Sequence, residues 1–142
     1  MLKKIYNSKW FPRFFYVKPD GGKSSGVTAF FLIEWKALFS IGILHFKKGT
    51  REAYHNHAFN ALTWWLKGGV TEIMLDGQEK IFKPSLKPKF TSKNCFHKVK
   101  SHEDTYALTF RSNWKNTWEE VRGKNHITLT HGRKEIKVNE SK

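Results

Sequence analysis

Two histidines one residue apart, His55 and His57, lie in the stretch REAYHNHAFNALTWWLKGGVTE, which covers residues 51–72. On a β-strand, side chains two positions apart point to the same face at a spacing of roughly 6–7 Å, which lets two imidazoles bind one cation. Arg51 shares this parity and would point into the same space. Two polar residues on a strand also explain the pair, so a metal site needs a further ligand from another element.

The sequence around this pair predicts strands. Turn signals separate runs of β-prone residues, which cover residues 13–17, 27–35, 39–47, 62–67, 70–75, 79–83, 95–100, 105–111 and 126–130. Asp76-Gly77 predicts a two-residue hairpin turn with positive φ at both positions, and His131-Gly132 predicts another. The best helix candidate is the first ten residues. We therefore expect an all-β fold, either an antiparallel sandwich or a barrel.

The order and spacing of short motifs resemble the cupin superfamily. Gly49 is followed by five residues and then by His55-Asn56-His57, and the next strand ends in the glycine turn WWLKGG. A second cupin motif brings a further histidine after a proline-containing loop, and here KPSLKPKFTSKNCFHKV supplies His97. Over residues 40–121 the pattern is similar to that of small RmlC-like cupin proteins common in phage genomes. The resemblance implies a single antiparallel β-barrel or jelly roll that holds the histidines on its interior face.

Length and composition fit one such domain. With 142 residues, among them 12 Phe, 6 Trp and 4 Tyr, the chain can enclose one sizeable core. We expect residues 1–142 to form one cupin domain, with residues 1–12 and 139–142 as peripheral ends. The sole cysteine, Cys95, cannot form an intrachain disulfide, and its parity places it on the strand face of His97 as an inert or a catalytic thiol. No apolar run has the length of a signal peptide or a membrane span, which indicates a cytoplasmic protein without a membrane partner, in the host cytoplasm if a phage encodes it.

The resemblance implies a metal centre at His55, His57 and His97. Cupins usually leave three or four residues between the second histidine and a glutamate ligand, but this chain has Ala61 and Leu62 at the two resulting positions. Three imidazoles with open positions can hold several divalent metals. Because thiol dioxygenases among the cupins use three histidines, we expect Fe(II) first, with Zn, Ni or Mn as alternatives. A cupin that has lost its metal is a further alternative, and no catalytic side chain is assigned.

Cationic and aromatic residues predict a small anionic substrate. Arg51 beside the histidines would need a partner, and a carboxylate or phosphate would supply one. Seven lysines and no acidic residue lie in residues 80–100, so Lys93 and its neighbours would form a positive rim. Trp65 would face the cavity by strand alternation, and Arg111 completes the candidate substrate-binding residues. Structural ion pairs, a solvated loop and core packing are the alternatives for these side chains.

The formal net charge of +14 adds a further function class. The excess is nearly all lysine, which is weaker than arginine at reading bases or phosphates in pairs of hydrogen bonds, and an AT-rich coding sequence also produces such an excess. The chain has no P-loop, dinucleotide fingerprint or nucleophile elbow. We therefore expect a metal-dependent cupin that performs dioxygenation or isomerisation. The alternatives are a non-enzymatic cupin that sequesters a nucleotide or another phosphorylated ligand, and a basic nucleic-acid-associated protein. The resemblance also allows a homodimer.

Overall fold

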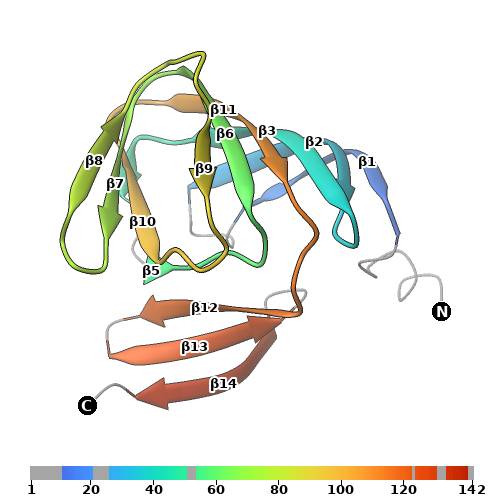
Figure 1. Cartoon of the computed structure of the whole chain (residues 1–142), viewed down its shortest axis with the longest axis vertical. Helices are drawn as coiled ribbons and strands as arrows, with labels where there is room; N and C mark the ends of the chain where they lie inside the picture. Colours follow the sequence, from blue (N-terminus) through green and yellow to red (C-terminus); the bar gives the residue numbers. More distant parts are fainter. Residues whose placement is uncertain (1–10, 21–25, 51–53, 123, 131–133, 141–142) are drawn as a thin grey trace.

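The computed structural model describes residues 11–20, 26–50, 54–122, 124–130 and 134–140 of the chain (Figure 1). These residues form antiparallel strands and no helix, which confirms the all-β prediction. No helix in this part of the chain is therefore long and apolar enough to cross a membrane. The predicted N-terminal helix, Arg51 and the predicted turn at His131-Gly132 lie outside the described residues.

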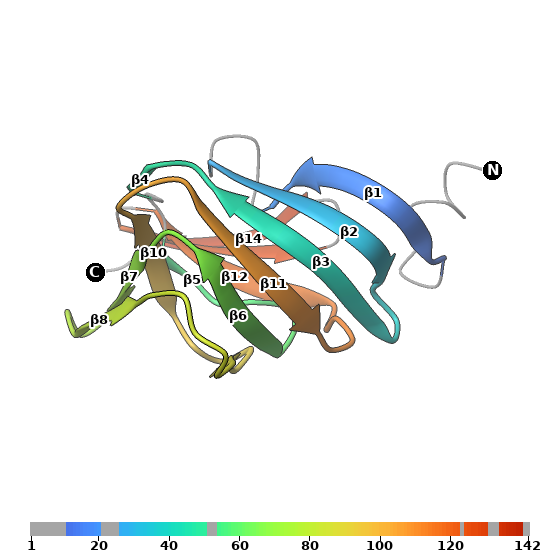
Figure 2. The ribbon, with the colours of Figure 1, turned by 90° about the horizontal axis from the view of Figure 1, so that it is seen from above.

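The strands form two sheets with an interior between them (Figure 2). The first sheet has the order β1 (Arg13–Pro19), β2 (Val27–Trp35), β3 (Phe39–Phe46), β11 (Thr105–Arg111), β6 (Ala61–Lys67) and β9 (Lys89–Thr91). The second has the order β14 (Lys134–Glu140), β13 (Asn125–Thr130), β12 (Thr117–Arg122), β5 (Tyr54–His55), β10 (His97–Ser101), β7 (Val70–Met74) and β8 (Glu79–Phe82), with β4 (Gly49–Thr50) paired to β10. Because strands far apart in sequence are neighbours, as in the pairs β3·β11 and β12·β5, the arrangement is a jelly roll.

Side chains along each strand point in turn to the inner and the outer face of its sheet, and the inward side chains of the two sheets pack against one another. On β2 and β11 nearly every second residue is buried, which is the period of a pleated strand. Phe31 is 2% exposed, and burying a side chain of this kind stabilises the fold by about 2–3 kcal/mol. Two buried apolar clusters result, one of Val27, Ala29, Phe31, Leu44, Trp65, Val70 and Ala107 and one of Ala58, Phe59, Ala61, Trp118, Ile127 and Leu129.

The hairpin predicted at Asp76-Gly77 joins β7 to β8, but its turn differs from the prediction. Only Gly77 has a positive φ, of +87°, and the backbone N of Met74 donates to the carbonyl oxygen of Gln78 at 2.9 Å around a three-residue loop. Asp76 avoids the left-handed region, and its Oδ1 accepts a hydrogen bond from the backbone N of Gln78 at 3.0 Å. The carboxylate therefore stabilises a longer loop with one glycine in the left-handed position.

Candidate metal centre

His55 is held on the inner face by strands on both sides. It is the last residue of β5, and it pairs with His97, the first residue of β10, and with Glu120 of β12. His55 and His97 are 3% and 5% exposed. Because residues directly opposite each other on paired strands point to the same face, this pairing brings two imidazoles together from distant parts of the chain.

His57 lies two residues beyond the end of β5, so the prediction that His55 and His57 share one strand is wrong. The buried residue between them explains the bend. Asn56 Oδ1 accepts a hydrogen bond from the backbone N of Glu119 at 2.7 Å, and the backbone N of Asn56 donates to the carbonyl oxygen of Glu119 at 3.1 Å. These two bonds tie the chain to β12 where the strand ends. The ring of His57 then stacks on Phe59, with ring centroids 5.0 Å apart.

The three imidazoles converge through their Nε2 atoms. Nε2 of His57 lies 3.0 Å from Nε2 of His55 and 3.4 Å from Nε2 of His97. One ligand atom of each histidine lies within 4.8 Å of the others. Two nitrogens that each bind one cation at about 2.0–2.1 Å lie roughly 3.0–3.4 Å apart at octahedral or tetrahedral angles. The three histidines therefore fit a divalent metal.

Glu72 of β7 lies behind His97, and the sequence analysis did not assign it to the site. Nδ1 of His97 donates to Glu72 Oε2 at 2.6 Å, and Lys89 Nζ of β9 donates to the same oxygen. Burial acts to raise the pKa of Glu72, but the hydrogen bonds and charges of His97 and Lys89 outweigh it and lower this pKa to about 2. A carboxylate on Nδ1 fixes the tautomer in which Nε2 is the acceptor, as in many metal-binding histidines. One sequence feature could have pointed to Glu72: it is the lone acidic residue of the apolar strand VTEIML, two positions after Val70, so both side chains point to the same face.

Cys95 lies near Glu72 and His97, and one ligand atom of each residue in this group lies within 4.8 Å of the others. The strand-parity argument for Cys95 fails because β10 begins at His97, and Cys95 is not among the residues that line the cavity. Burial, followed by the negative charge of Glu72, raises the pKa of the thiol. A protonated thiol is a poor metal ligand, so the three histidines are the better donor set.

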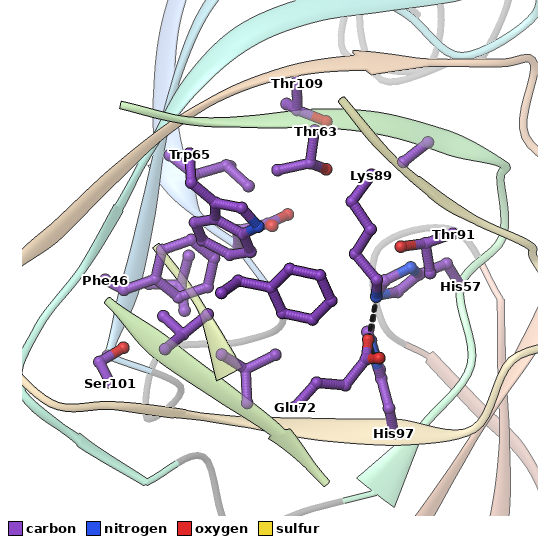
Figure 3. A pocket seen from close by; sticks show the side chains of 18 of the residues that line it. Phe46, His57, Thr63, Trp65, Glu72, Lys89, Thr91, His97, Ser101 and Thr109 are labelled. Carbon is purple, nitrogen blue, oxygen red and sulfur yellow. Dashed lines mark hydrogen bonds and ion pairs between the residues drawn. The ribbon is translucent and has the colours of Figure 1, made fainter. Parts of the chain in front are cut away.

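The histidines open onto a cavity of about 180 Å³ between the two sheets. Figure 3 shows His57, His97, Glu72 and Lys89 on one side of this hollow and Trp65 on the other. Cationic side chains outnumber acidic ones in the described lining of the cavity. The cations are Lys47, Lys48, Lys89 and Arg111, and the acids are Asp20 and Glu72. The balance of charge in the cavity therefore favours an anionic ligand.

Strand alternation along β6 decides which of its side chains reach the cavity. Ala61, Thr63 and Trp65 line it, as the alternation predicted. Trp64 lies on the opposite face and meets the ring of Phe110 edge-on at a centroid distance of 5.7 Å. Ala61 stands where the cupin motif carries glutamate, so β6 brings no carboxylate to the histidines.

The cationic residues predicted to bind substrate lie in different places. Arg111 lines the cavity and is 4% exposed, but its NH1 and NH2 donate to the two carboxylate oxygens of Asp20 at 3.1 and 2.7 Å. Lys93 is exposed and is not among the cavity-lining residues. Arg51 lies outside the described residues. Among the described lysines of the predicted rim, Lys89 is the one that lines the cavity.

Several solved structures similar to this chain are described as cupins. The chain is similar to an RmlC-like cupin from Shewanella frigidimarina, with 17% identity, a TM-score of 0.54, and coverage of 71% of this chain and 86% of that one. It is also similar to a cupin-superfamily sugar phosphate isomerase from Silicibacter pomeroyi, with 12% identity, a TM-score of 0.57, and coverage of 99% and 90%. For an ectoine synthase from P. lautus the identity is 12%, the TM-score 0.51, and the coverage 79% and 75%. No protein-family model and no curated protein sequence matches the chain. At identities this low, the structural similarity shows the fold alone, and it confirms the predicted cupin jelly roll.

Proposed function

We propose that the protein is a metal-dependent cupin that acts on a small anionic substrate in the cavity between its sheets. The observation that carries this proposal is the convergence of the Nε2 atoms of His55, His57 and His97, with Glu72 on Nδ1 of His97. Fe(II) is the first choice of metal, with Zn, Ni and Mn as alternatives. When bound, a divalent metal would supply Lewis acidity and, as iron, oxygen chemistry.

The remaining side chains at this end orient the ligands and balance their charge. Glu72 accepts the Nδ1–H of His97 and thereby fixes the direction of its ring. Lys89 pairs with the same carboxylate, so Glu72 adds no net negative charge that would repel an anion. The apolar part of the wall lowers the local dielectric constant, which strengthens the attraction between an anion and the cationic lining.

Two reaction classes suit these features. Dioxygenation agrees with a donor set of three histidines, which thiol dioxygenases among the cupins also use. Isomerisation agrees with the structural similarity to a sugar phosphate isomerase. The two classes differ in whether turnover consumes dioxygen.

A cupin that sequesters a phosphorylated ligand without turnover is the second candidate, because the cationic lining also suits a phosphate. The cavity of about 180 Å³ is smaller than the roughly 300–1,000 Å³ of pockets that enclose drug-sized ligands. A whole nucleotide would therefore extend out of the cavity mouth. Ligand binding that survives chelation would mark such a binder, whereas binding that falls steeply with salt would mark a nucleic-acid-associated protein.

The deciding experiment is elemental analysis of protein purified without a histidine tag, before and after incubation with Fe(II), Zn, Ni or Mn. We expect near-stoichiometric metal in the wild type and its loss in His97→Ala. His126→Ala is the matched control, because His126 is exposed on β13 and the variant should keep its metal. A wild type that takes up no added metal, or an unchanged metal content in His97→Ala, would overturn the proposal.

A further inference from the structure

The cavity has two chemically different ends, and Figure 3 shows His57, His97, Glu72 and Lys89 at one end and Trp65 and Phe46 at the other. The histidine end consists of His55, His57, His97, Glu72 and Lys89. The aromatic end consists of Trp65, Phe46 and Phe82. The ring centroid of Trp65 lies 5.5 Å from that of Phe46 and 6.2 Å from that of Phe82, and Phe82 extends toward the histidine end, where Lys89 Nζ lies 4.9 Å from its ring centroid. A ligand that fills both ends must therefore carry a polar group and an apolar body.

Trp65 carries a buried donor at the aromatic end. Its side chain lines the cavity, the residue is 8% exposed, and its Nε1 is buried with no hydrogen-bond partner among the described residues. A buried N–H group without an acceptor is costly, and native structures contain few of them. The unpaired Nε1 would therefore gain from an acceptor that a ligand brings to it.

The size of the cavity limits the apolar body. Its volume of about 180 Å³ compares with the roughly 150 Å³ of an engineered apolar cavity that binds benzene. One six-membered ring with a small head group fills such a space. A planar ring also suits the aromatic end, because aromatic rings gain from stacked and edge-on contacts with Trp and Phe.

We infer that the substrate of the proposed enzyme is a small ring-bearing acid. Its anionic group faces the histidine end, its ring lies against Trp65 and the two phenylalanines, and a ring atom or substituent accepts a hydrogen bond from Trp65 Nε1. The position of the head group rests on the proposed metal centre, whereas the role of Trp65 rests on the aromatic end alone. Trp65 thus determines which ring acids bind and takes no part in the chemistry.

Two probes of almost equal size test this role. Pyridine-4-carboxylate carries a ring acceptor opposite its carboxylate, and benzoate carries none. Calorimetric titrations would compare both probes on wild type, Trp65→Phe and Trp35→Phe, the last being a control because Trp35 is not among the cavity-lining residues. We expect Trp65→Phe to weaken pyridine-4-carboxylate by about fivefold and benzoate by less than twofold, since one net hydrogen bond is lost. The control should change neither affinity.

The outcomes separate this inference from the proposed function. Equal weakening of both probes by Trp65→Phe, or no binding of either probe to wild type, would refute the hydrogen bond from Trp65. Titrations repeated on chelated protein test the metal independently of the ring. If the selective loss in Trp65→Phe persists in a protein that never binds metal, the ring-acid inference stands and the metal centre falls.

A second and independent observation concerns the outer surface of the first sheet. Cross-strand register aligns apolar side chains in two rows that cross this sheet. We call these residues the outer apolar face: Val17, Phe30, Ile43, Leu108 and Trp64 in one row, and Phe14, Ile33, Ile41, Phe110, Leu62 and Phe90 in the other. Figure 2 shows β1, β2, β3, β11 and β6 side by side with no other described strand in front of them.

The outer apolar face is too large to be ordinary surface. Six of its side chains are 38% to 62% exposed, among them Phe90 at 62% and Phe14 at 61%. At about 150–250 Å² for a whole aromatic side chain, the face exposes on the order of 700 Å². A stable interface buries about 800 Å² per partner, and the largest apolar patch of a monomer is usually about 300–600 Å².

We infer that a second copy of this chain covers the outer apolar face. None of its residues is charged, although the chain carries +14, so it offers a polyanion no cation to bind. A two-fold dimer needs a surface that complements itself, and an apolar sheet face meets this need by packing sheet on sheet at about 10 Å. The two cavities would then lie on the far sides of the joined sheets.

Sedimentation of the wild type and two variants tests this interface. We expect a wild-type particle of twice the 16.7 kDa chain mass at micromolar concentration, and a monomer for Phe110→Lys, which places a charge within the face. Leu86→Lys is the matched control, because Leu86 is 97% exposed and lies outside the face, and it should remain a dimer. Circular dichroism checks that each variant is folded. A wild type that stays monomeric at 100 micromolar, about a hundredfold above the expected range, or a dimer that persists in folded Phe110→Lys, would refute the interface.

Discussion

Replacement of Glu72 by Gln tests how much the proposed metal centre depends on the carboxylate behind His97. Gln keeps the size of the side chain and can still accept the Nδ1–H of His97, but it removes the negative charge. The bond of 2.6 Å in a site where both side chains are less than a tenth exposed is a charge-assisted hydrogen bond, worth about 1.5–3 kcal/mol. The amide would also place its own donors near Lys89 Nζ, which loses its partner.

The expected loss of metal affinity follows from this energy. About 1.4 kcal/mol corresponds to a tenfold change, so Glu72→Gln should weaken metal binding by about 10- to 100-fold. Competition with a chromophoric chelator, titrated with Zn(II) at pH 7.5, measures the change directly. The side chain should remain ionised at that pH in the wild type, because the pKa of Glu72 is lowered to about 2.

Lys89→Met serves as the matched control. It removes the second partner of Glu72 and leaves the hydrogen bond from His97 in place, so we expect a loss of less than about threefold. A folded Glu72→Gln protein whose Zn(II) affinity stays within twofold of the wild type would refute the orienting role of Glu72. Equal losses in both variants would show that Lys89, and not the bond to His97, carries the effect.

Two further predictions concern stability. Burial, followed by the charge of Lys18, lowers the pKa of Lys36 to about 8, so charging this amine in the fold costs about 3 kcal/mol. Between pH 8 and 10.5 the unfolded chain binds the proton of Lys36 that the folded protein releases, so the stability of the wild type should rise relative to that of Lys36→Met as the pH increases through this window. Urea melting at several pH values measures both stabilities, and a difference between them that does not change with pH would contradict this prediction. Gly68→Ala should lower the unfolding free energy by about 2–4 kcal/mol, because Gly68 has φ +91° and a Cβ there would lie 2.4 Å from Thr105 Oγ1. Gly77→Ala, with open space around the Cβ, should lower the unfolding free energy by about 1 kcal/mol. Urea melting of both variants measures the difference, and equal losses would contradict the steric argument.

The strands that sequence patterns located well are those with long runs of β-prone residues. The ranges 27–35 and 105–111 coincide with β2 and β11 because large apolar side chains alternate along both. The pattern did not locate β9 or β12. The first has three residues after a lysine-rich, proline-containing loop, and the second reads TWEEVR, so neither shows an apolar alternation. Such strands form because their neighbours offer hydrogen bonds, and no local signal records this.

The candidate site could be predicted only where its ligands belong to a motif. The resemblance to cupin motifs implied one centre at His55, His57 and His97, and the structure brings their Nε2 atoms together. The sequence analysis did not identify Glu72 as part of the site, because its position there depends on strand register. Glu72 pairs with Val99, which is two residues from His97 on the same face of β10. A shift of one residue would turn it to the other face, and the sequence of β7 alone does not fix that register.

Two features together favour an anionic substrate: no carboxylate stands at Ala61, and the carboxylate of Glu72 lies behind His97. Three neutral imidazoles would leave the double charge of a bound metal uncompensated, whereas a glutamate ligand would have cancelled half of it. Glu72 does not make up the difference, because Lys89 already neutralises it. Asp20 is likewise paired with Arg111, so the two described acids of the lining offer no free negative charge to the centre. An anion from solution is then the natural counter-charge, and a carboxylate head group with its ring at Trp65 would bind more tightly to metal-loaded than to chelated protein.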